Sequence, residues 1–147
     1  MHDQEKGSQA RILVVDQEEW CRSFLSSVIK LLGFEDCRLV NTVNEALAAL
    51  EEAPFDLVIA DHRQPEYQRL LDNARSRHPG TRFIIMMQQR AQTHHLFYLE
   101  QVDIVYKPLS LDEIAGKIRH AIHQKNLRQA EEELKRLKQG ALRIFLR

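Results

Sequence analysis

The stretch RILVVDQEEW (11–20) decides the fold when it is placed beside FDLVIADHRQP (55–65) and VDIVYKPLSLDEI (102–114). Each contains a short run rich in Val, Ile or Leu, and each run is followed by a charged residue, which is Asp16, Asp61 or Lys107. Runs of this length and composition are typical of strands rather than of buried helices. Two similar runs lie elsewhere in the chain, so strands are predicted over residues 11–15, 36–41, 55–60, 82–87 and 102–106.

The segments between these runs carry apolar residues at helical spacing. The first helix ends at Gly33, and its predicted apolar face consists of Trp20, Phe24, Val28, Leu31 and Leu32. Further helices are predicted over residues 43–53, 67–77 and, from a weaker pattern, 92–100. Thr42 or Asn41 is the expected N-cap of the second helix. The last helix begins after Ser110, which forms a capping box with Glu113.

The strands alternate with single crossover helices, and this order builds a parallel sheet with helices on both faces. Five such units in 147 residues fit an open sheet and are too few for an eight-unit barrel. The predicted fold is therefore α/β, with a five-stranded parallel doubly wound sheet in the order 2-1-3-4-5. An extended C-terminal helix follows the sheet.

The composition is that of one soluble globular domain, with 44% apolar and 29% charged residues. Its 21 basic and 21 acidic residues balance, which argues against nucleic-acid binding by the domain as a whole. No apolar stretch approaches the ~18 residues of a membrane helix, and the polar N-terminus lacks the apolar core of a secretion signal. Cys21 and Cys37 form no CxxC pattern, so neither zinc nor a disulfide framework is indicated. We expect a cytoplasmic protein.

A second feature lies at the C-terminus, in residues 125–147, where the last helix is predicted to continue as an extension. Apolar residues recur there at spacings of three and four, in the order Leu127, Ala130, Leu134, Leu137, Ala141 and Ile144. Residues 124–147 carry seven basic residues against three Glu. Three interpretations stay open: the helix packs back on its own domain, it forms a coiled coil or links the domain to an output domain, or it is a basic tail for a membrane or nucleic acid.

The charged residues at the strand ends point to chemistry at one edge of the sheet. In the order 2-1-3-4-5 the first and third strands are neighbours, so Asp16 and Asp61 face one another, and Lys107 approaches from the fifth strand. The chain has no GxGxxG and no GxxxxGK[ST] motif, which argues against a dinucleotide or nucleotide-triphosphate site. Two carboxylates and a lysine suit phosphoryl chemistry: one Asp can act as the nucleophile, the neighbouring carboxylate helps to hold Mg²⁺, and Lys contacts a phosphoryl oxygen.

The segments ILVVDQEE, FDLVIADHRQP and VDIVYKPLSLDEI resemble the three signature segments of the response-regulator receiver domain (CheY-like) of two-component signal transduction. The resemblance covers residues 10–124 and implies a flavodoxin-like fold, preceded by a disordered segment at 1–9. It implies a phosphorelay signalling domain rather than an enzyme, with at most self-catalysed phosphotransfer and autodephosphorylation. The implied partners are a histidine kinase or phosphotransfer protein, and a homodimer partner or output domain reached through the C-terminal helix. No nucleic acid or membrane is expected to bind this domain.

The resemblance also assigns site residues. Asp61 is the implied phospho-acceptor, and Lys107 is the implied phosphoryl contact. Mg²⁺ is implied at Asp16, Asp61 and the backbone carbonyl of Arg63. The family's second metal-binding acid is replaced by Gln17, so Gln17 or Glu18 is expected to complete a weaker Mg²⁺ site.

Further departures concern the phosphoryl contact and the switch. Met87 or Gln88 takes the place of the family's Ser or Thr, and Ile104 takes the place of its switch aromatic. The long cation of Arg63 could stand in for the metal by pairing with Asp61. These departures leave an alternative open, which is a degenerate receiver that acts as a phosphorylation-independent protein-interaction module.

Overall fold

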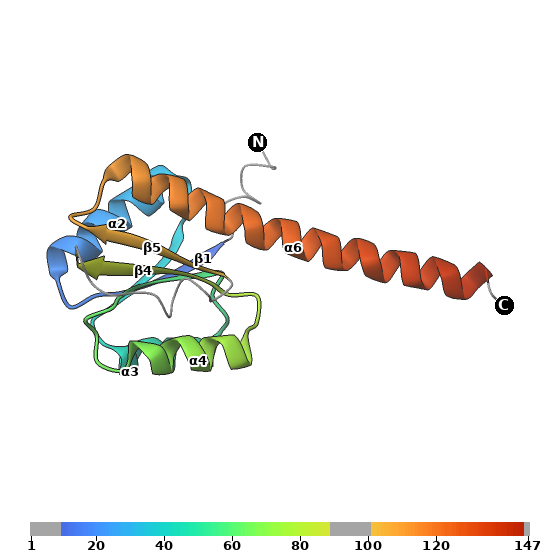
Figure 1. Ribbon diagram of the computed structural model, residues 1–147, viewed down its shortest axis with the longest axis horizontal. Helices are drawn as coiled ribbons and strands as arrows, with labels where there is room; N and C mark the ends of the chain where they lie inside the picture. The colour runs from blue at the N-terminus through green and yellow to red at the C-terminus, as the bar shows by residue number, and fades with distance from the viewer. Residues whose placement is uncertain (1–9, 89–100, 146–147) are drawn as a thin grey trace.

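The fold is a single parallel sheet covered on both faces by helices (Figure 1). The structure is a computed structural model and describes residues 10–88 and 101–145. Its strands are β1 (Arg11–Val15), β2 (Asp36–Val40), β3 (Leu57–Asp61), β4 (Arg82–Gln88) and β5 (Val102–Lys107). Its helices are α2 (Glu19–Leu31), α3 (Val43–Glu52), α4 (Tyr67–Arg77) and α6 (Leu111–Phe145). The helix predicted over 92–100 and the segment 1–9 lie outside the described residues.

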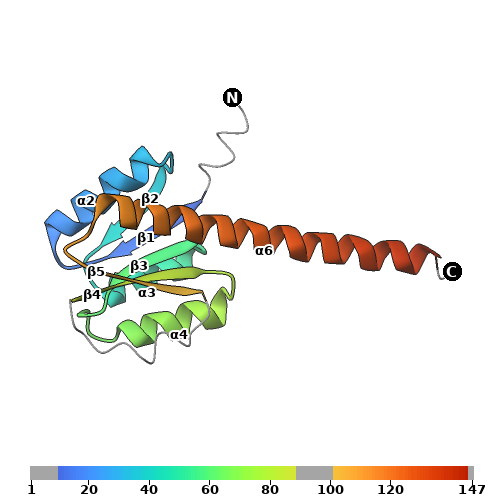
Figure 2. The ribbon, with the colours of Figure 1, turned by 45° about the horizontal axis from the view of Figure 1, so that its top comes forward.

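The strands lie in the order β2-β1-β3-β4-β5 and all described pairs are parallel, which confirms the predicted doubly wound sheet. Two apolar clusters, one on each face, hold the helices to the sheet. One cluster joins α3 and α4 to the sheet, and the other joins α2 and the first part of α6 to the opposite face (Figure 2). Alternate residues of β1, β3 and β4 enter opposite clusters, because successive side chains of a strand point to opposite faces.

The predicted apolar face of α2 is partly wrong. Trp20 is 54% exposed and Leu31 is 79% exposed. The buried face consists instead of Cys21, Leu25, Val28 and Ile29. The stripe that begins at Cys21 fits the helical period as well as the stripe that begins at Trp20, and the turn that follows β1 directs the Cys21 stripe onto the sheet.

Helix α2 ends and helix α3 begins as the sequence predicts. Gly33 has a φ of 92° just after α2, and the amides of Gly33 and Phe34 donate to carbonyls of the last turn, at Lys30 and Ile29. Thr42, rather than Asn41, caps α3, because its hydroxyl accepts from the amide of Glu45 at 3.2 Å.

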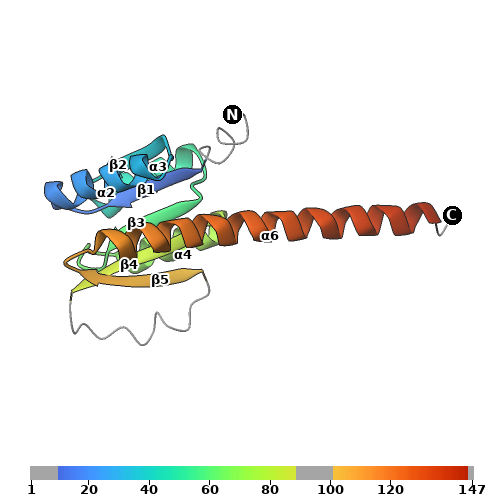
Figure 3. The ribbon, with the colours of Figure 1, turned by 90° about the horizontal axis from the view of Figure 1, so that it is seen from above.

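Helix α6 leaves the domain after covering the sheet. Its buried residues are Ile114, Ile118, Ala121 and Ile122, and every residue from Asn126 to Arg143 is exposed. Figures 1, 2 and 3 show this second half as a single helix that projects beyond the sheet. The interpretation that the extension packs back on its own domain is therefore wrong. Among the described helices, none combines the length and apolarity needed to span a membrane.

Candidate functional site

Asp16, Asp61 and Lys107 meet at the carboxyl ends of β1, β3 and β5, as the strand order predicts. The Lys107 ammonium lies between the two carboxylates, with Nζ 2.8 Å from Asp16 Oδ2 and 2.7 Å from Asp61 Oδ2. It also lies 3.2 Å from Glu18 Oε1. The three groups form one ion-paired cluster although they are far apart in the chain.

The charged groups of the cluster are buried, so each of them needs a partner. Asp16 is 0% exposed, Asp61 is 3% exposed and Lys107 is 7% exposed. Buried charges are costly unless they are paired and hydrogen-bonded. Asp16 meets this requirement through Lys107 on one oxygen and the amide of Glu18, 2.8 Å away, on the other.

Arg63 supplies a second cation to the cluster. Its guanidinium donates to Asp61 Oδ2 from Nη2 at 2.7 Å and from Nε at 3.1 Å, and its backbone amide donates to Asp61 Oδ1 at 2.8 Å. The same Nη2 contacts Glu18 Oε1. The predicted ion pair between Arg63 and Asp61 is therefore confirmed. Glu18 is a second partner of Arg63, which the residue pattern did not indicate.

These ion pairs and hydrogen bonds shift the pKa values of the charged side chains in the cluster. Burial alone would raise the pKa of Asp61, but the side-chain hydrogen bonds from Arg63 and Lys107 outweigh it and lower that pKa to about 2. The pKa of Glu18 is lowered to about 2, first by its hydrogen bond from Trp20 and then by Arg63. Burial opposes the charge of Lys107, yet hydrogen bonds to Asp16 and Asp61 raise its pKa.

Three acids are placed so that they could hold one cation. Asp16, Glu18 and Asp61 each offer an oxygen, and these oxygens all lie within 4.8 Å of one another. Carboxylate oxygens are the ligands that Mg²⁺ prefers, so the donor set fits that ion. Gln17 is exposed and lines a separate shallow cavity beside Thr42, so the structure brings Glu18 rather than Gln17 to the acids.

The remaining predicted site residues lie around this cluster rather than in it. Met87 is buried in the apolar cluster beneath α3 and α4, where it fills the core. Gln88 is exposed at the end of β4, and its Cα pairs with that of Lys107 in the β4–β5 register. Ile104 is half-buried against the same apolar cluster as Met87.

Trp20 belongs to the site, although its apolar character suggested the helix core. Its Nε1 donates to Glu18 Oε2 at 2.6 Å, and the centroid of its ring lies 5.8 Å from Lys107 Nζ. His62 is a further neighbour, with Nδ1 3.5 Å from Asp61 Oδ1 and 3.1 Å from the carbonyl oxygen of Met86. The only signal for either residue was its position close to Asp16 or Asp61 in the chain.

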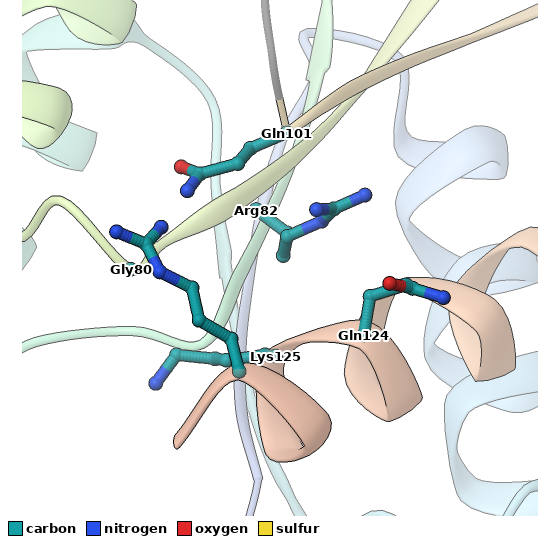
Figure 4. Close-up of a pocket in the computed structure, with 6 residues that line it drawn as sticks. Gly80, Arg82, Gln101, Gln124 and Lys125 are labelled. Atoms are coloured by element: carbon teal, nitrogen blue, oxygen red, sulfur yellow. The ribbon is translucent and has the colours of Figure 1, made fainter. Parts of the chain in front are cut away.

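A larger cavity, of about 540 Å³, lies at the opposite end of the sheet, beside the first residues of β4 and β5 (Figure 4). Its lining is basic and polar and consists of Gly80, Arg82, Gln101, Gln124, Lys125 and Arg128. Lys125 already pairs with Asp56 at 2.6 Å. No acid is among these lining residues, so a divalent cation fits the carboxyl edge and not this cavity.

An open five-stranded parallel sheet with an acid pair and a lysine at its carboxyl edge defines a receiver-type α/β domain. A family model described as the response regulator receiver domain matches residues 12–119. The chain belongs to the response regulator receiver domain family.

Known relatives agree with this assignment. The regulatory protein AtoC of Escherichia coli (strain K12) is 31% identical over 134 residues, which are 88% of this chain and 28% of AtoC. The chain thus spans less than a third of that protein's length. A CheY-like receiver domain protein from Methanospirillum hungatei JF-1 has a similar fold, with a TM-score of 0.72 and 23% identity over 81% of this chain and 98% of that one. NtrX from Brucella abortus has a TM-score of 0.77 and 23% identity, covering 86% of this chain and 29% of NtrX.

Membership defines the general role of the chain. Receiver domains are signalling domains of two-component systems rather than classical enzymes, and they bind Mg²⁺ at an acidic pocket. Response regulators interact with histidine kinases or phosphotransfer proteins and with output domains.

Proposed function

We propose that Asp61 is the residue that accepts the phosphoryl group, from a histidine kinase or phosphotransfer protein, and that Asp16, Glu18 and Asp61 provide the oxygen ligands for Mg²⁺. The observation that carries the proposal is the position of Lys107 Nζ, 2.7 Å from the carboxylate of Asp61 and 2.8 Å from that of Asp16. A fixed ammonium at this point is available to a phosphoryl oxygen as soon as one is attached to Asp61.

The proposed transfer is a displacement at phosphorus. A carboxylate oxygen of Asp61 forms the new P–O bond, while the bond from phosphorus to the donor's nitrogen or oxygen breaks and its electron pair leaves with the donor. The low pKa of Asp61, about 2, keeps its carboxylate ionised. Bound Mg²⁺ would neutralise charge on the transferred group. Lys107 orients that group, and Asp16 holds Lys107 in place.

A second candidate function is that of a phosphorylation-independent interaction module. It is favoured by the pairing of Asp61, whose two oxygens already accept from Arg63 and Lys107. The core position of Met87 also favours it, because a thioether offers no hydroxyl to a phosphoryl oxygen.

Intact-mass measurement after incubation with acetyl phosphate and Mg²⁺ separates the two functions. The wild-type chain and Asp56→Asn, a control whose carboxylate pairs with Lys125 far from the acid cluster, are expected to gain one phosphoryl group. Asp61→Asn is expected to gain none. No gain in the wild type, or a gain that survives Asp61→Asn, would overturn the assignment of Asp61.

We also propose that residues 10–124 form the receiver and that residues 125–147 pair with the same segment of a second copy. The leucines of this extension, Leu127, Leu134 and Leu137, are 44%, 53% and 63% exposed on one stripe of α6. In a parallel pair, Glu133 of one copy faces Lys138 of the other, because these residues are five positions apart on either side of the stripe. The two charges are complementary.

Light scattering of Leu134→Glu and Gln139→Glu tests the pairing. Both changes add an acid to an exposed part of α6, but only Leu134 lies on the apolar stripe. A dimer is expected for the wild type and for Gln139→Glu, and a monomer for Leu134→Glu. A monomeric wild type would contradict the pairing and favour an extension that joins the receiver to an output domain.

A further inference from the structure

We infer that Arg63 is a resident counter-ion that competes with the divalent cation, so that Mg²⁺ binds this receiver only by displacing the guanidinium from Asp61 and Glu18. The inference deepens the proposed function and rests on it in one respect, because the acids concerned are those proposed to bind Mg²⁺. Mg²⁺ binding can nevertheless be measured whether or not Asp61 accepts a phosphoryl group.

The competition follows from the contacts of the guanidinium. Nη2 of Arg63 lies 2.7 Å from Asp61 Oδ2 and also contacts Glu18 Oε1. Asp61 and Glu18 are two of the three acids whose oxygens come within 4.8 Å of one another. A cation that bridges these two acids therefore needs oxygens that Arg63 already holds.

The charge of the cluster leads to the same conclusion. Asp16, Glu18 and Asp61 carry three negative charges, and Lys107 and Arg63 carry two positive charges at contact distance. Only one negative charge is left uncompensated, which is little attraction for a divalent ion. Removing Arg63 leaves two, and a guanidinium cannot relieve the competition by losing its proton at any ordinary pH.

The exposure of the two cations indicates which one leaves. The side chain of Lys107 is 6% exposed and is held by two buried carboxylates. The side chain of Arg63 is 44% exposed and that of Glu18 is 35% exposed, so this pair lies at the mouth of the site. The contact with Glu18 breaks at little cost because both side chains are partly exposed. The contact with Asp61, whose side chain is only 4% exposed, is the one that Mg²⁺ must replace.

Trp20 provides a readout that does not depend on phosphorylation. It is the only tryptophan of the chain. Its Nε1 is hydrogen-bonded to Glu18 Oε2, and its ring lies 5.8 Å from Lys107 Nζ. A cation that takes Glu18 away from Arg63 changes the surroundings of the indole, so its fluorescence follows Mg²⁺ binding.

The test is a Mg²⁺ titration of the full chain by Trp20 fluorescence and by calorimetry. Arg63→Ala is expected to bind Mg²⁺ at least about tenfold more tightly than the wild type, which corresponds to about 1.4 kcal/mol. Arg63→Gln, which keeps a polar side chain and loses the charge, is expected to change the affinity in the same direction. Arg69→Ala is the matched control, because Arg69 pairs with the exposed Glu66 and touches none of the three acids. It is expected to bind Mg²⁺ as the wild type does.

The outcomes distinguish this inference from the proposed function. Equal affinities for the wild type, Arg63→Ala and Arg63→Gln would overturn the inference, as would a gain of the same size in Arg69→Ala. The gain in Arg63→Ala should disappear when Asp61→Asn is added, and a gain that persists would also overturn it. A tighter Mg²⁺ site in Arg63→Ala without any phosphoryl gain would support the inference while the phospho-acceptor proposal fails.

Discussion

Replacement of Lys107 by Met is expected to destabilise the fold strongly, although it removes only one charge. Met retains much of the length and the apolar stem of the side chain, so the change isolates the ammonium group. In the wild type that ammonium pairs with the fully buried Asp16 and the nearly buried Asp61.

The expected loss of stability depends on the partners that the two carboxylates keep after Lys107 is replaced. Asp61 keeps the guanidinium of Arg63, whereas Asp16 keeps hydrogen bonds from the amide of Glu18 and the thiol of Cys21 but loses its positively charged partner. Removal of one partner from a buried ion pair leaves an uncompensated buried charge and costs about 3–5 kcal/mol. We expect the free energy of unfolding to fall by that amount in Lys107→Met. More than half should return in the double variant Lys107→Met/Asp16→Asn, because the unpaired charge is then absent.

Urea unfolding followed by far-ultraviolet circular dichroism measures this effect. Lys135→Met is the control, because Lys135 is an exposed lysine on the projecting part of α6 with no role in the proposed pairing of two copies, and it should change the free energy of unfolding by less than about 0.5 kcal/mol. A loss of stability in Lys107→Met of under about 1 kcal/mol would mean that no buried carboxylate depends on the ammonium of Lys107.

Three smaller tests concern the pH dependence of stability, the two cysteines and Gly33. The pKa values of Asp61 and Glu18 are lowered to about 2, so the stability that these carboxylates contribute is complete above about pH 5 and is lost as the pH falls towards 2. The difference between the unfolding temperatures at pH 6 and pH 3 should therefore be smaller in Asp61→Asn than in the wild type. Burial raises the pKa of Cys21 to about 12 and that of Cys37 to about 11, so iodoacetamide at pH 8 should leave both thiols unmodified in the folded chain and alkylate both in urea. Gly33→Ala should lower the free energy of unfolding by about 1–2 kcal/mol in a urea titration, because the φ of 92° is unfavourable for any residue with a Cβ atom.

The sheet could be predicted from the sequence because each strand and each helix is marked by a pattern of neighbouring residues. Five short apolar runs, each followed by a helical pattern, leave few ways to arrange a chain of this length. The predicted strands differ from the observed ones by no more than two residues at either end. Strand order then placed Asp16, Asp61 and Lys107 at one edge without any knowledge of side-chain conformations.

The orientation of α2 shows where local patterns are insufficient. Trp20 and Cys21 begin two overlapping apolar stripes, and each stripe continues through the helix at acceptable spacing. Which stripe faces the sheet depends on the turn between β1 and α2, whose geometry is not encoded in periodicity. Glu18 could not be chosen over Gln17 for the same reason, because that choice also depends on how the turn directs each side chain.

The extension of α6 illustrates a different limit. The spacing of Leu127, Leu134 and Leu137 indicates a continuous apolar stripe, but the same stripe can pack on the domain or remain exposed. The structure excludes packing on its own domain because the described residues after Lys125 are exposed up to Arg143. Which partner covers the stripe depends on a second chain or domain.

We propose that Asp61, held beside Lys107 and Asp16, is the residue that carries the phosphoryl group. The most direct measurement is reduction of the acetyl phosphate-treated chain with borohydride, which converts an aspartyl phosphate to homoserine, followed by peptide mass mapping. We expect homoserine at position 61 in the wild type and at no position in Lys107→Met or Asp61→Asn. Homoserine at another aspartate, or an unmodified Asp61 after the same treatment, would contradict it.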